Sequence, residues 1–248
     1  MWIEYCSVTC YDKYMPIVKK LNHDFFKKWT REMAYVLGFF AADGSMMQNK
    51  RGGHFIEFHI TDRCVLVSIR KVLGSDHKIS LRNQKKKHHR LSYRLQLGSR
   101  EYFNDISLLG FTPNKSKIVR FPFVEKDFLG DFVRGYFDGD GCVFFKRYKV
   151  KDRRKMRWVF QTRFTSGSKQ FLDGLHFSLR EQGGVQRGFI LEKSKNSGWE
   201  LVLSHNDSVA LSTLMYNNVP HNLFLPRKYR IFKRALRTLF GQKLEMRL

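Results

Sequence analysis

The sequence predicts an α+β protein built from two tandem αββαββα repeats, with antiparallel sheets that form a saddle over a pair of packed helices. Three observations predict this fold. The same order of helical and strand-like segments occurs twice, the strand-like segments alternate polar and apolar side chains, and two glycine-containing helices end in the same Asp-Gly pair. The chain has 248 residues, of which 42% are hydrophobic and 15% aromatic, so it can bury a sizeable core.

The first repeat is expected at 30–120. Its first helix begins after Thr30, a favourable N-cap residue, and runs through EMAYVLGFFAADG. The elements that follow are strands at 45–48 and 54–60, a helix capped by Thr61 that stops before Gly74, strands at 78–82 and 90–97, and a helix capped by Ser99 that reaches Leu109. An N-terminal arm at 1–29 precedes them, and we expect its residues Phe25, Phe26 and Trp29 to pack against this repeat.

The second repeat is expected at 129–248, after a linker at 121–128. Its first helix, LGDFVRGYFDGDG, ends at Gly141. The elements that follow are strands at 142–150 and 157–165, a helix at 168–182, strands at 185–191 and 198–204, a helix capped by Asn206 and a basic helix at 227–240.

The chain is strongly basic, with 46 Lys and Arg against 22 Asp and Glu and a formal net charge of +24. Nucleic acid is the usual partner of such a chain, and an anionic membrane surface is the alternative. Membrane binding would require a basic amphipathic helix, whereas much of the charge here falls on predicted strands and loops. The most apolar stretch, Met33–Ala42, is about half the length that a bilayer requires.

The N-terminus and the cysteines indicate an intracellular protein. MWIEYCSVTC lacks the basic segment and apolar run of a secretory signal, so we expect a DNA-associated protein in a prokaryotic cytoplasm or an organelle. The four cysteines, at positions 6, 10, 64 and 142, form no CxxC pair and no zinc-ligand spacing. We therefore expect free thiols.

One face of each predicted sheet is polar and basic. Its members are Lys78, Ser80, Arg82, Arg90, Ser92, Arg94 and Gln96 in the first repeat, and Arg157, Gln161 and Arg163 in the second. The alternate residues, which include Leu81, Leu91, Leu95, Trp158 and Phe160, are expected to pack into the core. The polar faces hold almost no acid, unlike an ordinary solvated sheet face, and Arg, Gln and Ser contact phosphates and base edges. We therefore predict that these faces bind nucleic acid.

Three loop lysines, Lys85, Lys86 and Lys87, would extend this contact to further phosphates. A solvated hairpin tip is an equally good interpretation of that loop.

Two of the predicted helices are suited to close packing. Gly38 and Ala42 stand four residues apart in the first helix, and Gly135 and Gly139 stand four apart in the second. Small residues at this spacing form a stripe that lets two helix backbones approach each other. We expect these two helices to pack side by side.

An acid lies in the last turn of each of these helices. Asp43 and Asp140 each precede a glycine, at the helix end where the dipole already disfavours negative charge. If the helices pack in parallel, both carboxylates converge with free backbone carbonyl groups. Hard oxygen ligands of this kind suit Mg²⁺, and Mg²⁺ beside a phosphate backbone suits phosphodiester hydrolysis. The alternative, that Asp-Gly simply forms a turn, would have to hold twice.

At these positions the chain resembles the LAGLIDADG homing endonucleases, in their monomeric form with two motifs. VLGFFAADG and VRGYFDGDG resemble the two signature motifs, and the likeness extends over nearly all of 30–240. It implies that Asp43 and Asp140, with the carbonyl groups of Ala42 and Gly139, bind two or three Mg²⁺ ions. Asp138 matches a further acid of the motif that is not a metal ligand, and Ala41 lacks it.

A second pair of segments strengthens the resemblance. Pro113-Asn-Lys-Ser-Lys and Pro226-Arg-Lys-Tyr-Arg follow the fourth strand of each repeat. In the family a lysine here points into the active site, which implies this role for Lys115 and Lys228. A simple phosphate contact is the alternative. Asp62 and Ser166 align with a polar position that orders water near the site, although Asp62 would also suit the first turn of any helix.

The resemblance implies a monomeric endonuclease that cuts both strands of a long, asymmetric DNA site. The main alternative is a binding module on the same fold, either an intron RNA maturase or a transcription regulator. Regulators typically lose the acids, whereas a maturase can keep them. We do not favour an intein, because no Cys, Ser or Thr follows His221-Asn222.

Overall fold

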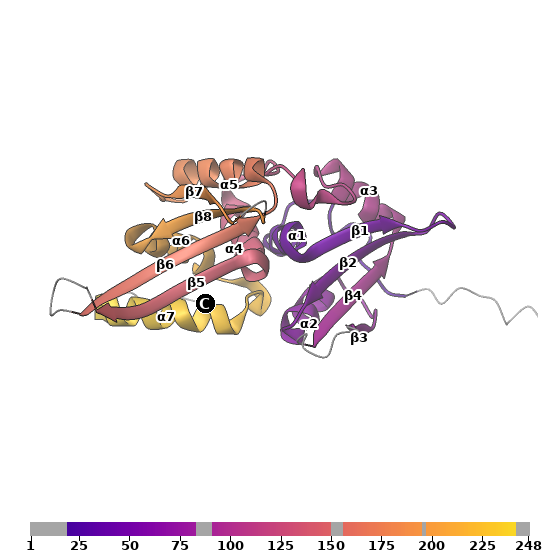
Figure 1. Ribbon diagram of the computed structural model, residues 1–248. Coiled ribbons are helices and arrows are strands. Elements are labelled where there is room, and N and C mark those ends of the chain that lie inside the picture. The colour runs from indigo at the N-terminus through magenta and orange to yellow at the C-terminus, as the bar shows by residue number, and fades with distance from the viewer. Residues whose placement is uncertain (1–18, 83–90, 150–155, 195–196, 242–248) are drawn as a thin grey trace, which may run out of the picture.

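The computed structural model describes residues 19–82, 91–149, 156–194 and 197–241, which form two halves of the same architecture (Figure 1). The first half contains α1 (Arg31–Asp43), β1 (Gly44–Gln48), β2 (His54–Ile60), α2 (Arg63–Val72), β3 (Ile79–Arg82), β4 (Ser92–Gly98), α3 (Arg100–Leu108) and the 3₁₀ turn η1 (Lys115–Lys117). The second half contains α4 (Lys126–Asp140), β5 (Gly141–Lys149), β6 (Met156–Ser166), α5 (Lys169–Gln182), β7 (Phe189–Glu192), β8 (Trp199–Ser204), α6 (His205–Tyr216), the 3₁₀ turn η2 (Pro220–Asn222) and α7 (Pro226–Phe240).

Each half carries one antiparallel four-stranded sheet. The strand orders are β1-β2-β4-β3 and β5-β6-β8-β7, so the two halves have the same topology. Helices α1 and α4 lie together at the centre of the molecule, between the two sheets (Figure 1). The predicted fold, two tandem αββαββα repeats with antiparallel sheets, is confirmed.

The predicted caps of two helices, Thr30 and Ser99, are confirmed, and Ser168 also proves to be a cap, at the start of the helix predicted at 168–182. The hydroxyl groups of Thr30, Ser99 and Ser168 accept hydrogen bonds from the third backbone amide of α1, α3 and α5. Two other predicted caps are wrong by one or two residues. The N-cap of α2 is Asp62 rather than Thr61, and that of α6 is Ser204 rather than Asn206.

Strand β7 begins later than predicted. The backbone amides of Gln186 and Arg187 donate to Oδ1 of Asp207, at 2.8 and 3.2 Å, and Gly188 has a φ of 129°. Because these amides are bonded to a side chain of α6, the strand starts only at Phe189. Helix α4 begins earlier than predicted, at Lys126, so its first turn takes in part of the expected linker.

The apolar face of each sheet is packed in its centre but not at its ends. Leu95 and Phe160 are buried, as predicted. Leu81 and Leu91 are 59% and 68% exposed, contrary to the prediction, because Leu81 lies on the edge strand β3 and Leu91 precedes β4. Trp158 is also partly exposed, and its ring stacks on Phe145 with 4.4 Å between centroids.

The described end of the N-terminal arm packs as expected at two of three positions. Phe25 and Phe26 are buried, and the ring of Phe26 meets Tyr102 of α3 edge-on at 4.9 Å between centroids. Trp29 instead stacks on Phe128 of α4, with 5.9 Å between centroids, and so contacts the second repeat.

The stripes of small residues bring α1 and α4 into backbone contact. A β-carbon on Gly38 would clash with the carbonyl group of Phe132, and one on Gly135 would clash with the carbonyl group of Tyr35. One on Gly139 would clash with the β-carbon of Ala42. Tyr35 of α1 contacts Gly135 of α4, and Ala42, further along α1, contacts Gly139, further along α4. The two helices therefore run in parallel, and their C-terminal ends meet.

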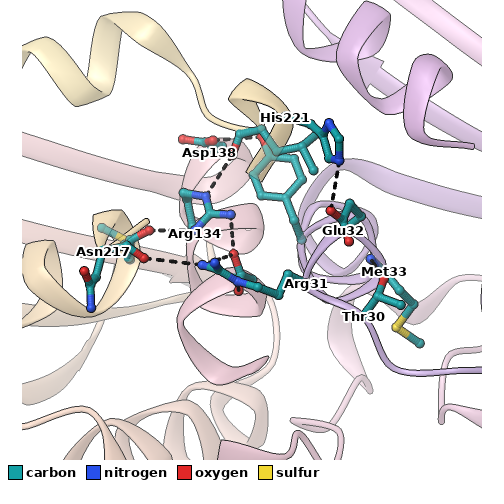
Figure 2. A network of polar contacts seen from close by, with 12 residues as sticks. Thr30, Arg31, Glu32, Met33, Arg134, Asp138, Asn217 and His221 are labelled. Carbon is teal, nitrogen blue, oxygen red and sulfur yellow. Dashed lines mark hydrogen bonds and ion pairs between the residues drawn. The ribbon is translucent and has the colours of Figure 1, made fainter. Parts of the chain in front are cut away.

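Buried polar contacts join the N-terminal halves of the same helices. Arg134 is 1% exposed, and its guanidinium donates to Asp131 at 2.5 Å and to the carbonyl groups of Met215 and Leu223. Arg31 of α1 reaches the same carboxylate at 2.8 Å, and Figure 2 shows Arg31 and Arg134 as parts of one network of polar contacts. This network fixes the first repeat against the second.

Among the described residues, none of the helices is long and apolar enough to cross a membrane. Cys64 and Cys142 are free thiols, as predicted, and both are exposed. Cys6 and Cys10 lie outside the described residues.

Candidate active site and nucleic-acid interface

The C-terminal ends of α1 and α4 bring Asp43 and Asp140 together. Both are the last residues of their helices, and both are partly buried. A β-carbon on Gly139 would lie only 3.1 Å from Oδ2 of Asp43, so the Asp43 carboxylate lies against the end of the opposite helix. The expected convergence of two carboxylates with two helix ends is present.

Lys115 and Lys228 lie at the same helix ends, where both are buried. The ammonium group of Lys115 donates to the carbonyl of Ala41 at 3.0 Å. That of Lys228 donates to the carbonyls of Phe137, Asp138 and Gly139 at 2.6, 2.9 and 3.2 Å. Each lysine therefore neutralises the C-terminal end of the helix that carries the aspartate of its own repeat.

The four side chains perturb one another. Burial, together with the charge of Asp140, raises the pKa of Asp43 to about 7, although Lys228 and Lys115 counteract this. Burial also raises the pKa of Asp140, against the effect of the two lysines. Burial lowers the pKa of Lys115 and of Lys228 to about 8, against the effect of the two aspartates. Two acids and two cations thus share one desolvated place, which is typical of a functional site.

This donor set fits a hard divalent cation. Burial raises the pKa of both partly buried carboxylates, and the charge of Asp140 adds to this effect at Asp43, so the pair can accept more positive charge. Backbone carbonyl groups at the helix ends add neutral oxygen ligands. Within the described residues no group of three or more His, Cys, Asp or Glu side chains could hold a metal ion. A cation here would therefore keep much of its water, as Mg²⁺ does, and would not suit a zinc-type cage.

Asp138 lies beneath this site and is fully buried. Its Oδ2 accepts hydrogen bonds from the hydroxyl of Tyr35 at 2.9 Å and from the amide of Leu225 at 2.8 Å. Leu225 is the N-cap of α7, which carries Lys228. Burial raises the pKa of Asp138 to about 6, although Lys228 counteracts this. Asp138 therefore connects α1, α4 and α7. The equivalent position of the first repeat is Ala41, which has no carboxylate and cannot make these contacts.

Asp62 and Ser166 do not occupy equivalent positions. Phe58 pairs with Gly44 in the first sheet and Phe164 with Gly141 in the second, so the equivalent of Asp62 is Ser168. Oδ2 of Asp62 accepts from Nε of Arg227 in α7 at 3.0 Å, which is a contact between the repeats. The hydroxyl of Ser166 is buried and accepts from the amide of Ser168 at 3.1 Å. The predicted equivalence of Asp62 and Ser166 is therefore wrong by two residues.

The polar sheet faces are present, and they lie opposite the buried leucines and phenylalanines. In the first sheet, Gln96 pairs with Glu57, and Arg94 lies between His59 and Ser80. Arg82 pairs with Ser92 at the end of β3, and Lys78 is exposed just before that strand. In the second sheet, Arg157, Gln161 and Arg163 alternate along β6, with Arg157 and Arg163 exposed. Arg90 and the loop lysines Lys85, Lys86 and Lys87 lie outside the described residues.

The prediction that these faces hold almost no acid is wrong in one respect. Each face carries a glutamate at its centre, Glu57 in β2 and Glu200 in β8, and each contacts an arginine of the neighbouring strand. The period-2 pattern of HFIEFHI already placed Glu57 on the polar face, so this residue could have been found from the sequence.

The structure is that of a two-repeat protein with one composite site. Two parallel helices pack through small residues, each ends in an acid, and a basic sheet lies on each side of them. Comparison with known families gives the same class. A sequence model described as the LAGLIDADG-like domain matches residues 31–106 and 127–211, which is more than half of the chain. The chain belongs to the LAGLIDADG family.

Solved structures with the same fold are homing endonucleases. A variant of I-SmaMI has a TM-score of 0.58 at 14% identity, with 85% of this chain and 92% of that chain covered. I-LtrWI bound to target DNA has a TM-score of 0.56 at 14% identity, with coverage of 89% and 92%. I-SmaMI bound to cleaved DNA has a TM-score of 0.55 at 13% identity, with coverage of 89% and 99%.

A curated relative is the DNA-directed RNA polymerase subunit Rpo1C of Methanocaldococcus jannaschii. It is 28% identical over 167 residues, which are 66% of this chain. The chain spans only 16% of the length of that relative.

Proposed function

We propose that this chain is a monomeric, site-specific endonuclease that cuts both strands of a long, asymmetric DNA site. The observation that carries the proposal is the meeting of two aspartates and two lysines at the ends of α1 and α4, between two basic sheet faces. A protein that only bound nucleic acid would need the basic faces. It would not need two desolvated carboxylates held close enough for the charge of Asp140 to raise the pKa of Asp43. The DNA-bound structures of I-SmaMI and I-LtrWI support duplex DNA as the partner.

In this proposal each repeat covers one half of the site. The arginine, glutamine and serine side chains of the sheet faces would enter the major groove and contact base edges. Lysines at the loops and strand ends would contact phosphates and fix the register. The net charge of +24 would speed association with DNA and make binding sensitive to salt.

At the centre, Asp43 and Asp140, with the carbonyl groups of Ala42 and Gly139, would hold two or three Mg²⁺ ions. Bound Mg²⁺ would supply Lewis-acid stabilisation of phosphate charge and a more acidic water for in-line attack, without a covalent enzyme intermediate. Lys115 and Lys228 hold a proton on Nζ at neutral pH, since their pKa values are about 8. They would place positive charge beside the two scissile phosphates. The packed helices would set the two halves of the site at a fixed separation.

The test is selection of cleavable sites from a random duplex library with Mg²⁺. We expect one long asymmetric site to be recovered, with one cut in each strand. A folded chain that selects a binding site but cleaves none would contradict the proposal. That outcome would favour the binding-module alternative, a regulator or a maturase.

A further inference from the structure

The two glutamates on the polar sheet faces each contact the side chains around them. Oε1 of Glu57 accepts a hydrogen bond from Nε2 of Gln96 and lies 3.5 Å from a terminal guanidinium nitrogen of Arg94. Oε2 of Glu57 lies 2.9 Å from Nε2 of His59. Both carboxylate oxygens are therefore used by residues of the same face.

The second sheet repeats this arrangement. Oε2 of Glu200 lies 3.2 Å from a terminal guanidinium nitrogen of Arg163, and Oε1 lies 3.5 Å from Nζ of Lys193. Nε of Arg163 also donates to the side chain of Gln161 at 3.0 Å. The arginine is thus held at two points, which leaves its other donors free to face outward.

The two arrangements are related by exchange of charge. Glu57 and Arg163 occupy equivalent positions, because each immediately precedes the phenylalanine that pairs with Gly44 or Gly141. Arg94 and Glu200 are likewise equivalent, because each immediately precedes the leucine that pairs with that phenylalanine. The acid is on the inner strand β2 in the first sheet and on β8 in the second. The same diagonal pair of positions therefore carries opposite charges in the two repeats.

Exposure distinguishes a side chain that reads bases from one that positions a reader. The side chain of Glu57 is 5% exposed and that of Arg94 is 39% exposed. The side chain of Glu200 is 13% exposed and that of Arg163 is 45% exposed. A carboxylate covered by its neighbours cannot extend to a cytosine amino group, whereas the arginine beside it can extend to guanine.

We propose that Glu57 and Glu200 are specificity-determining positioning residues that hold the DNA-reading side chains of their sheets in one orientation. Fixing a long side chain before binding lowers the entropy lost on binding and favours one donor geometry. Because the charges are exchanged between the repeats, the arginine is presented from β4 in one half and from β6 in the other. The two half-sites must then differ in sequence at this position. This proposal rests on the proposed function.

The test compares Glu57→Gln, Glu200→Gln and the wild-type chain on a duplex site selected by wild-type binding. Binding to all single-base variants of that site is measured for each protein. We expect Glu57→Gln to reduce discrimination about tenfold at one or two base pairs of one half-site. Glu200→Gln should do the same in the other half-site only. The cleavage rate at saturating protein is measured in parallel, so that a loss of base discrimination is scored separately from a loss of rate.

Glu192→Gln is the charge-matched control, because Glu192 is an exposed acid of β7 on the same sheet as Glu200. Its loss should raise affinity for all sequences alike, as the removal of any negative charge near DNA does. Glu57→Asp is a second, independent variant for this test. It keeps the charge but withdraws the carboxylate from Arg94 and Gln96, and it should also relax base preference.

Three results would overturn the proposal. If Glu57→Gln only raises affinity uniformly, as the control does, the glutamates merely balance charge. If Glu57→Asp keeps wild-type preferences, position is irrelevant and charge alone matters. If both glutamine variants alter the same half-site, the exchange between repeats has no consequence. Failure of the wild-type chain to select any site would instead overturn the proposed function, and this proposal with it.

Discussion

Two buried lysines neutralise the helix ends that carry the acids, and their environments differ. Lys228 reaches three carbonyl groups, whereas Lys115 reaches one. Both lie over an aromatic ring, Phe137 and Phe40, with about the same separation of 5.3 and 5.4 Å. A role in catalysis and a role in phosphate binding make different demands on such a group, and they can be separated by experiment.

We expect Lys115→Met and Lys228→Met to slow cleavage by about a hundredfold, which is typical for loss of one positioned charge or proton-transfer group. Methionine keeps the apolar stem in its buried place. Affinity for the selected site should fall only slightly, because the ammonium groups face the helix ends. Single-turnover rates and equilibrium binding are measured on the same duplex. An equal loss of rate and affinity would reduce these lysines to ordinary phosphate contacts.

The raised pKa of Asp43 has a consequence for stability. The pKa of Asp43 is about 7 in the folded state, above the ordinary value of 3.8. Between pH 3.8 and 7 the folded chain therefore binds more protons than the unfolded chain. The contribution of Asp43 to stability is therefore greatest below pH 4 and is lost as the pH rises to about 7. Asp43→Asn removes this dependence. In the absence of metal and DNA, we expect the melting temperature of Asp43→Asn, relative to that of the wild type, to increase as pH rises from 4.5 to 7.5.

Mg²⁺ should counteract the loss of stability that the wild type shows as pH rises. Because ionised carboxylates bind the cation, added Mg²⁺ should raise the melting temperature at pH 7.5 and have little effect at pH 4.5. A rise of equal size in the Asp43→Asn, Asp140→Asn double variant would place the stabilising cation elsewhere.

The helix pair α1–α4 depends on the absence of two side chains. At Gly38 and Gly135 the nearest atoms to an added β-carbon are backbone carbonyl groups of the opposite helix, which cannot move without separating the helices. Separation of the helices would also separate Asp43 from Asp140. Stability and site geometry are therefore coupled at these two positions.

We expect Gly38→Ala and Gly135→Ala each to destabilise the fold by about 3 kcal/mol, at the upper end of the usual cost of overpacking. Gly98→Ala is the matched control, because its β-carbon would meet only ordinary contacts with Phe55 at 3.5 Å. Chemical denaturation measures all three. If the two helix variants are as stable as the control, the close packing of α1 and α4 is not needed for the fold.

Local signals in the sequence predicted the elements well and their ends less well. Thr30 and Ser99 cap their helices as expected, because an N-cap depends on residues next to each other in the chain. The start of β7 was missed because it depends on Asp207, about twenty residues further on, whose carboxylate bonds the amides of the expected strand. Periodicity carries no information about such a partner.

The same distinction applies to the whole molecule. The repeat, the glycine stripes and the Asp-Gly ends predicted that Asp43 and Asp140 would meet, since each signal is local and occurs twice. The ion pair between Asp62 and Arg227, which joins the two repeats, could not be predicted, because it depends on how they are placed. The exchanged glutamates and arginines of the two sheets became visible only once the strand registers were known.

The most direct test of the central claim, that the aspartate pair is a hydrolytic centre, uses Asp43→Asn and Asp140→Asn. Asparagine keeps the shape of the side chain, removes the charge that would hold Mg²⁺ and relieves the repulsion at the helix ends. Each variant should bind the selected site nearly as well as the wild type, be at least as stable, and fail to cut both strands with Mg²⁺. Cleavage of both strands by either variant at near the wild-type rate would contradict the account.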